Sequence, residues 1–189
     1  MPCASSHHEL RSRTKMTGER VVIGVGGNMG DPVATLSSAL DELGKLAVGE
    51  IVVSNIYRSE PVGLGNDASD FANAVAQFEC EFEPMMLLKR LQTLEQRFGR
   101  VRQTAGSRMD GSHAYESRTL DLDIISFGDR LIAEGDLQVP HPRAFERLFV
   151  LLPLQEIDPG FQFADRAESL QQLIDQAPEM AIRSWQHNQ

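Results

Sequence analysis

The sequence contains little cysteine and no long apolar run. Its 189 residues include only two cysteines, Cys3 and Cys80, too few for a disulfide framework. We expect both to be free thiols, as suits a reducing compartment. No apolar segment reaches the roughly 20 residues that a membrane-spanning helix needs, and no apolar signal region precedes the first expected strand. These absences indicate a cytoplasmic protein.

Positively charged residues are also fewer than acidic ones, which gives a formal net charge of −9. An acidic chain is a poor general partner for nucleic acid or anionic membranes, although a local basic pocket is not excluded. The composition, 41% hydrophobic and 24% charged, is ordinary for one globular domain, which we expect to be a monomer or weak dimer. The polar stretch 1–16 predicts a disordered tail before a domain over 17–189, with Met16 a candidate start.

Two periodicities alternate along the chain and predict its secondary structure. The clearest strand pattern puts Ala74, Ala76 and Phe78 on one face, and Asp31-Pro32 is typical of a helix start. The order β-α-β-β-α-β predicts an α+β fold, a single-domain, ferredoxin-like α/β sandwich with helices on one face of a mainly antiparallel sheet. Strands are expected at 20–28, 50–59, 74–82 and 118–127, with edge pieces in 130–140, and helices at 32–44, 84–99, 143–156 and 167–177.

The stretch "SRTLDLDIISFG" sets two aspartates in an otherwise apolar strand. Strand side chains alternate, so Asp121 and Asp123 share a face, with Cα atoms about 6.5 Å apart. Two such carboxylates suit one site for Mg²⁺, and a pair of metal ions about 3.5–4 Å apart would clamp the oxygens of a phosphoryl-type transfer. Taken alone, the pattern also fits a half-exposed strand with two solvated acids.

Arginines are dense in the segment that leads to this strand. Arginine is the fork-shaped donor preferred for polyphosphate, and acids that hold a metal beside arginines that hold phosphate suit a nucleotide. Each arginine could instead belong to an ordinary solvated loop. The unpatterned segment 103–117 is long for a connection inside a compact domain, which favours a functional loop. The arginines are Arg97, Arg100, Arg102, Arg108 and Arg118.

The glycine-rich turn "GVGGNMGD" is not a known nucleotide motif. After Gly24 and Gly26, Met29 stands where the dinucleotide-binding pattern needs glycine, and the Gly-Lys-Ser/Thr of a phosphate-binding loop is missing. Two interpretations stay open: a tight strand-to-helix turn, or backbone that packs closely against a small ligand.

Six stretches over Val21 to Ile157, in order, resemble the 6-hydroxymethyl-7,8-dihydropterin pyrophosphokinase family of folate biosynthesis. The resemblance implies that ATP donates an intact pyrophosphoryl group to the hydroxymethyl of a reduced pterin, releasing AMP, with two Mg²⁺ ions. The stretches are "GVGGNMGDP", "SNIYRSEPVG", "DFANAV", "LQTLEQRFGRVR", "RTLDLDIISFG" and "VPHPRAFERLFVLLPLQEI".

The resemblance also assigns roles to residues on the nucleotide side. Asp121 and Asp123 would be the metal ligands, and Arg100, Arg118 and Asp123 the catalytic set. ATP-binding positions would be Gln92, Glu95, Arg102, Ile124, His141 and Arg147, with Ile124 acting through its backbone.

A flat pterin ring needs aromatic faces and an amide for its donor–acceptor edge. By resemblance, Phe71 and Phe149 are the faces and Asn73 is the amide, while Ser59 and Val62 add mainly backbone contacts. Phe71 and Asn73 are two residues apart on a strand and therefore share a face. Core packing is the other interpretation of each phenylalanine.

The loop 103–117 departs from the family pattern. It is longer than in compact members, "AYESR" replaces the common "RWGPR", and Gln103 replaces a lysine. Glu60 also stands where proline is common. Two other functions stay open: another Mg²⁺-dependent phosphotransferase or nucleotide hydrolase, and a non-catalytic pterin- or nucleotide-binding protein. The first would release ADP in place of AMP, and the second would bind without forming AMP.

Overall fold

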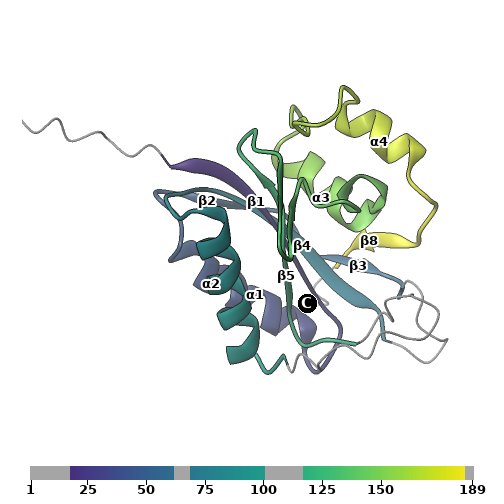
Figure 1. The fold of residues 1–189 in the computed structure, drawn as a ribbon. Coiled ribbons are helices and arrows are strands. Elements are labelled where there is room, and N and C mark those ends of the chain that lie inside the picture. Colours follow the sequence, from purple (N-terminus) through teal and green to yellow (C-terminus); the bar gives the residue numbers. More distant parts are fainter. Residues whose placement is uncertain (1–17, 62–68, 101–116, 186–189) are drawn as a thin grey trace, which may run out of the picture.

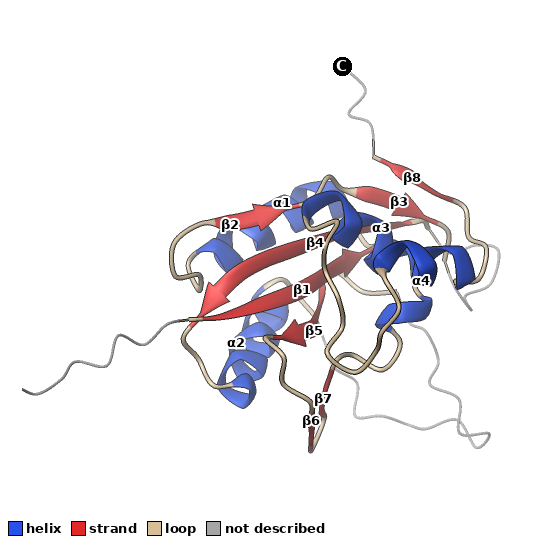
Figure 2. Cartoon of the chain, turned by 90° about the horizontal axis from the view of Figure 1, so that it is seen from above, coloured by secondary structure: helices blue, strands red, loops and turns tan. Residues whose placement is uncertain are grey.

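The computed structural model has an antiparallel sheet packed between helices (Figures 1 and 2), and it describes residues 18–61, 69–100 and 117–185. The six-stranded sheet has the order β5-β1-β4-β3-β8, and β2 also pairs with β4. Its strands are β1 (Glu19–Gly27), β2 (Ile51–Val53), β3 (Tyr57–Ser59), β4 (Phe71–Cys80), β5 (Asp121–Phe127) and β8 (Ile182–Ser184), and the helices are α1 (Pro32–Gly44), α2 (Pro84–Arg97), α3 (Leu148–Ile157) and α4 (Leu170–Gln176).

Helices cover both faces of the sheet, as Figure 1 shows, whereas the sequence placed them on one face. α1 and α2 cover the face that carries Ile23 and Leu122, and α3 and α4 cover the face that carries Val22, Val75 and Ile125. The central strands have apolar side chains at successive positions, so both faces must be buried. The α+β sandwich of ferredoxin-like order is confirmed, and the one-sided arrangement was wrong.

The two long helices begin and end where the sequence predicts. The Asp31 carboxylate accepts a hydrogen bond from the N–H of Ala34 at 3.1 Å and caps α1, with Pro32 in the first turn. α2 begins at Pro84 and is followed by Gly99, whose φ of +83° suits glycine. The end of α2 matters for function because it delivers the chain to Arg100.

Two expected elements are divided in the structure. The strand expected over 50–59 is split into β2 and β3. Between them, the Ser54 hydroxyl accepts a hydrogen bond from the N–H of Val75 at 3.0 Å, in place of a backbone carbonyl. The helix expected over 143–156 starts as a 3₁₀ turn, η1 (Ala144–Glu146), and α3 begins only after Arg147, whose backbone is extended. This second break places Arg147 beside the pocket.

The short edge elements are partly as predicted. β6 (Ile132–Glu134) and β7 (Leu137–Val139) pair with each other in a two-stranded sheet, as expected, whereas β8 was not predicted. The tail 1–16 and residues 103–116 of the long loop lie outside the described residues. In the described part of the chain, no helix is long and apolar enough to cross a membrane.

Candidate active site

A pocket of about 380 Å³ lies between the sheet and the start of α3. Its walls come from β1, β3, β4 and β5, from the turn after β7 and from the first turn of α3. The structure brings together ten of the predicted site residues here: Ser59, Phe71, Asn73, Arg100, Arg118, Asp121, Asp123, His141, Arg147 and Phe149.

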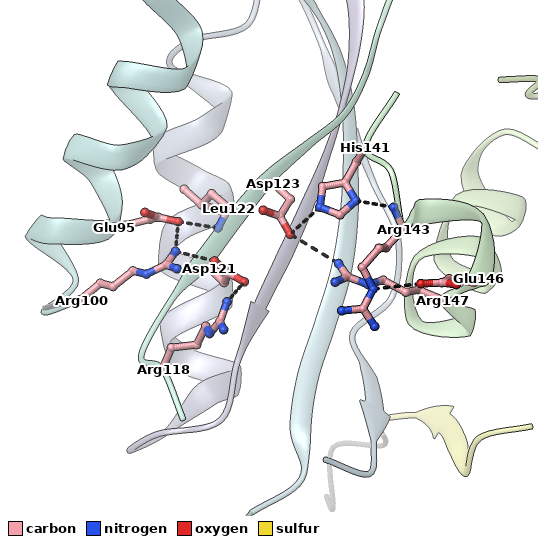
Figure 3. Close-up of polar contacts among 10 residues, drawn as sticks. All are labelled: Glu95, Arg100, Arg118, Asp121, Leu122, Asp123, His141, Arg143, Glu146 and Arg147. Atoms are coloured by element: carbon pink, nitrogen blue, oxygen red, sulfur yellow. Dashed lines mark hydrogen bonds and ion pairs between the residues drawn. The ribbon is translucent and has the colours of Figure 1, made fainter. Parts of the chain in front are cut away.

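Asp121 is surrounded by arginine (Figure 3). Its Oδ1 accepts a hydrogen bond from Arg100 and its Oδ2 accepts one from Arg118. Arg100 also pairs with Glu95, a carboxylate that is only 1% exposed and that accepts the N–H of Leu122 at 2.9 Å. Burial opposes ionisation of Arg100, but Asp121 and Glu95 together raise its pKa. The four charges form one connected network at the end of α2.

Asp123 has looser partners on the opposite side of the pocket. Its Oδ2 is 3.8 Å from both His141 Nε2 and Arg147 Nη1, beyond hydrogen-bonding distance. The N–H of Arg143 donates to His141 Nδ1 at 3.2 Å, so a neutral imidazole carries its proton on Nε2, toward Asp123 (Figure 3). Arg147 Nε is buried and has no hydrogen-bond partner among the described residues.

These surroundings shift two pKa values in opposite directions. Burial in the pocket, together with the negative charge of Asp121, raises the pKa of Asp123 to about 6. Burial and the positive charge of Arg147 lower the pKa of His141 to about 4. The Asp123 side chain is 38% exposed, and that exposed part lines the pocket. Asp123 is therefore a carboxylate without close compensation, beside a neutral histidine.

The glycine turn after β1 fixes the segment that carries Arg118. Asn28 is buried, and its side chain accepts the N–H of Arg118 at 2.9 Å and donates to the Ser117 hydroxyl at 3.1 Å. A Cβ on Gly27 would lie 2.4 Å from the carbonyl oxygen of Thr119, so only glycine permits this approach. Gly24 also lines the pocket. The turn is therefore tight, and packing of the strand before it against a small ligand stays a prediction.

An amide and two phenylalanines form the other end of the pocket. Asn73 is buried, and its Nδ2 donates to the Ser59 hydroxyl at 3.0 Å. Phe71, on the same face of β4, and Phe149, in the first turn of α3, are half-buried and line the pocket. Half-buried rings beside an oriented amide favour a flat heteroaromatic ligand over plain core packing.

Some predicted residues lie elsewhere. Gln92, on α2, is not part of the pocket lining, and Glu95 lies beneath it as the buried partner of Arg100. Ile124 faces the core on the α1/α2 side, as the alternation of β5 requires. Arg102 and Val62 lie outside the described residues.

Sequence reasoning missed two charged residues that line the pocket, Arg143 and Glu60. Arg143 follows "HP" in the turn after β7, so its charge two residues beyond His141 was the available signal. Glu60 was noted only as a departure from the family pattern.

The donor set fits a divalent cation such as Mg²⁺. Asp121 and Asp123 offer carboxylate oxygens on one face of β5, and burial together with the charge of Asp121 raises the pKa of Asp123, so a bound cation would stabilise its charged form. The described residues contain no group of three or more histidine, cysteine, aspartate or glutamate side chains that could hold a metal. Mg²⁺ is commonly held by one or two carboxylates plus substrate phosphates, so the missing ligands would come from a phosphorylated substrate.

Comparison with known proteins gives a consistent family match. The model of the family described as 7,8-dihydro-6-hydroxymethylpterin-pyrophosphokinase matches residues 22–159. A 2-amino-4-hydroxy-6-hydroxymethyldihydropteridine pyrophosphokinase from Synechocystis is 35% identical over 162 residues, covering 85% of this chain and 77% of the relative. The Haemophilus influenzae protein of the same name is 38% identical over 136 residues, covering 71% and 79%.

Solved structures show the same fold at low sequence identity. Plasmodium falciparum HPPK-DHPS, crystallised with pteroate, superposes with a TM-score of 0.64 at 12% identity over 84% of this chain. Its A437G variant gives 0.65 at 14% identity, also over 84%. This chain spans 42% and 45% of those two solved chains, so the likeness concerns one part of each.

Proposed function

The chain belongs to the 7,8-dihydro-6-hydroxymethylpterin-pyrophosphokinase family, and from this we infer how its pocket works. The reaction transfers pyrophosphate from ATP to the hydroxymethyl group of 6-hydroxymethyl-7,8-dihydropterin in folate biosynthesis. The hydroxyl group loses its proton to solvent and its oxygen forms a bond to the β-phosphorus of ATP, while the bond between that phosphorus and the α,β-bridging oxygen breaks and AMP leaves with this oxygen. We propose that Asp121, Asp123 and the surrounding arginines hold the phosphate chain, while the aromatic end holds the pterin.

At the phosphate end, Asp121 and Asp123 would hold two Mg²⁺ ions, which neutralise the phosphate charge when bound. Arg100 and Arg118 are already aimed at that place, since both hydrogen-bond to Asp121. A triphosphate offers these guanidinium groups stronger acceptors, so we propose that they transfer from Asp121 to phosphate oxygens. Arg147 and His141 would bind phosphate oxygens from the opposite side of the pocket. In this arrangement the protein mainly positions the reactants and balances charge.

At the pterin end, Phe71 and Phe149 would stack on the ring, and Asn73 would bind its donor–acceptor edge. The Ser59 hydroxyl accepts from Asn73 Nδ2, which fixes the amide so that its oxygen is available to the ligand. This end carries the proposal: a general phosphotransferase needs the acids and arginines, but it has no need of two aromatic faces and a buried amide in the same pocket.

The decisive test is one assay with purified protein, Mg-ATP and 6-hydroxymethyl-7,8-dihydropterin, with AMP and ADP quantified separately. We expect AMP formation that requires both the pterin and Mg²⁺. Asn73→Ala should weaken pterin binding by about 5- to 50-fold, through loss of one to two hydrogen bonds, and leave binding of ATP analogues unchanged. Release of ADP, or ligand binding without AMP, would support one of the two other functions.

A further inference from the structure

The strand β8 lies along the outer edge of β3 (Figure 2), and Ser59 at the end of β3 lines the pocket. The two strands pair antiparallel, with Ser59 opposite Ile182. The pairing continues at both ends: Glu60 N–H donates to the carbonyl oxygen of Ala181 at 3.2 Å, and Trp185 N–H donates to the residue before β3 at 2.6 Å. β8 is therefore attached along the whole of β3.

Glu60 makes a second bond to the same residue. Its carboxylate Oε1 accepts the N–H of Ala181 at 3.1 Å, so backbone and side chain both hold the beginning of β8. Glu60 also lines the pocket next to Ser59, whose hydroxyl accepts from Asn73. The attachment point of β8 is thus one residue away from the group that orients the buried amide.

The segment before β8 shares a second, open cavity with the start of α3. This cavity, of about 550 Å³, is lined by Glu60, Leu148, Glu179, Met180 and Ala181. Leu148 begins α3 and immediately precedes Phe149, one of the two aromatic faces. Phe71, the other face, lies on β4 opposite Ser59 at the end of β3. The segment 179–181 therefore lies beside the two walls of the aromatic slot: the end of β3 with the paired part of β4, and the start of α3.

We propose that the segment 179–184, attached through Glu60, sets the spacing of these two walls and thereby the affinity of the slot for the pterin. Glu60 is a positioning residue in this proposal, since it acts through Ser59 and through the start of α3. The inference rests on the proposed function, because it assumes that a pterin occupies the slot. Coupling between binding and β8 must be reciprocal, so ligand in the slot should stabilise β8 in turn.

The first test uses 6-hydroxymethylpterin as a fluorescent probe, with saturating Mg²⁺ and α,β-methylene-ATP, which is unable to release AMP. Glu60→Ala should weaken pterin binding by about 2- to 10-fold, the effect of losing one exposed hydrogen bond, and leave the affinity for the ATP analogue unchanged. Glu60→Gln should bind like the wild type, because its amide oxygen can still accept from Ala181.

Glu179→Ala is the matched control for charge. It removes one carboxylate from the same cavity, and no hydrogen bond to Glu179 is seen among the described residues. We expect no change in pterin affinity for this variant. Unchanged pterin binding by Glu60→Ala, or an equal loss of affinity for pterin and ATP analogue, would overturn the proposal.

A second test needs no variant and follows hydrogen exchange in the wild type. Binding of 6-hydroxymethylpterin should slow exchange of the amides of residues 181–185 beyond the effect of the ATP analogue alone. Exchange that is unchanged by the pterin would contradict the proposed coupling. Absence of pterin binding in the wild type itself would instead refute the function on which the inference rests, so the two failures are distinguishable.

Discussion

Asp121 and Asp123 lie two residues apart on the same face of β5, yet their surroundings differ. Both Asp121 oxygens accept hydrogen bonds from arginine, and a buried Glu95 completes the network behind them. Among the described residues, the nearest partners of Asp123 are His141 Nε2 and Arg147 Nη1, both 3.8 Å from its Oδ2, and its pKa is raised to about 6. The comparison shows that one strand can present two identical carboxylates in different electrostatic surroundings: arginines hydrogen-bond to Asp121 in the free protein, whereas the partners of Asp123 lie beyond hydrogen-bonding distance.

The difference arises from which elements approach each carboxylate. Asp121 faces the end of α2, where the chain turns through Gly99 and delivers Arg100. Asp123 faces the turn after β7, where the His141 N–H donates to the carbonyl oxygen of Ile125 on β5 and the Arg147 N–H donates to that of Ala144. Substitutions in the surroundings of Asp121 and of Asp123 should therefore separate activity from stability.

The largest effect is expected from Asp123→Ala. Loss of a carboxylate proposed to hold metal at the reacting phosphates should lower turnover by about 10²- to 10⁴-fold. At neutral pH the free energy of unfolding should stay equal or rise, because Asp123 has no hydrogen bond to another described residue and burial disfavours its charge. AMP formation and urea denaturation measure the two quantities. Asp129→Ala, in the exposed turn after the same strand, is the control, and near-normal turnover of Asp123→Ala would refute the metal role.

Glu95→Ala should have the opposite profile and cost mainly stability. The substitution leaves the Leu122 N–H and the Arg100 guanidinium without a buried acceptor, which typically destabilises by about 2–4 kcal/mol. Urea denaturation of the free protein gives the value, with exposed Gln96→Ala on the same helix as the control. A loss below about 0.5 kcal/mol would show that the Asp121 network does not stabilise the fold.

The sequence predicts one part of this comparison and not the other. Alternation in "DLDII" correctly places Asp121 and Asp123 on one face, because strand geometry is local. The buried role of Glu95 depends on contact with Leu122, 27 positions away, which no local pattern encodes. The break at Arg147 was not predicted, because the apolar residues of α3 that follow it continue the helical pattern expected from residue 143 onward. β8 was missed because three residues are too few for a periodic signal.

Arg118→Ala should sharpen the comparison in the free protein. One oxygen of Asp121 loses its arginine, so Mn²⁺, used as a probe without nucleotide, should bind about 3- to 10-fold more tightly. Arg147→Ala also removes one positive charge from the pocket, but its nearest Asp123 oxygen is 3.8 Å away, so the gain should be smaller. Electron paramagnetic resonance of free Mn²⁺ measures both affinities. Equal gains in Mn²⁺ affinity would mean that the overall charge of the pocket, and not the hydrogen bond from Arg118 to Asp121, controls metal binding.

The smallest expected effect is a pH dependence of stability to which Asp123 contributes beside His141, whose own pKa is lowered to about 4. In the folded protein the pKa of Asp123 is raised to about 6 from a usual 3.8, so the folded state binds the proton more tightly than the unfolded state. The stabilisation linked to this proton is complete below about pH 4 and is lost as pH rises to 6. Relative to Asp123→Asn, the wild type should therefore lose stability between pH 4 and 6 and stay level above pH 7. Urea denaturation in EDTA at each pH measures this difference, and a difference that is constant from pH 4 to 7 would show that Asp123 is compensated as fully as Asp121.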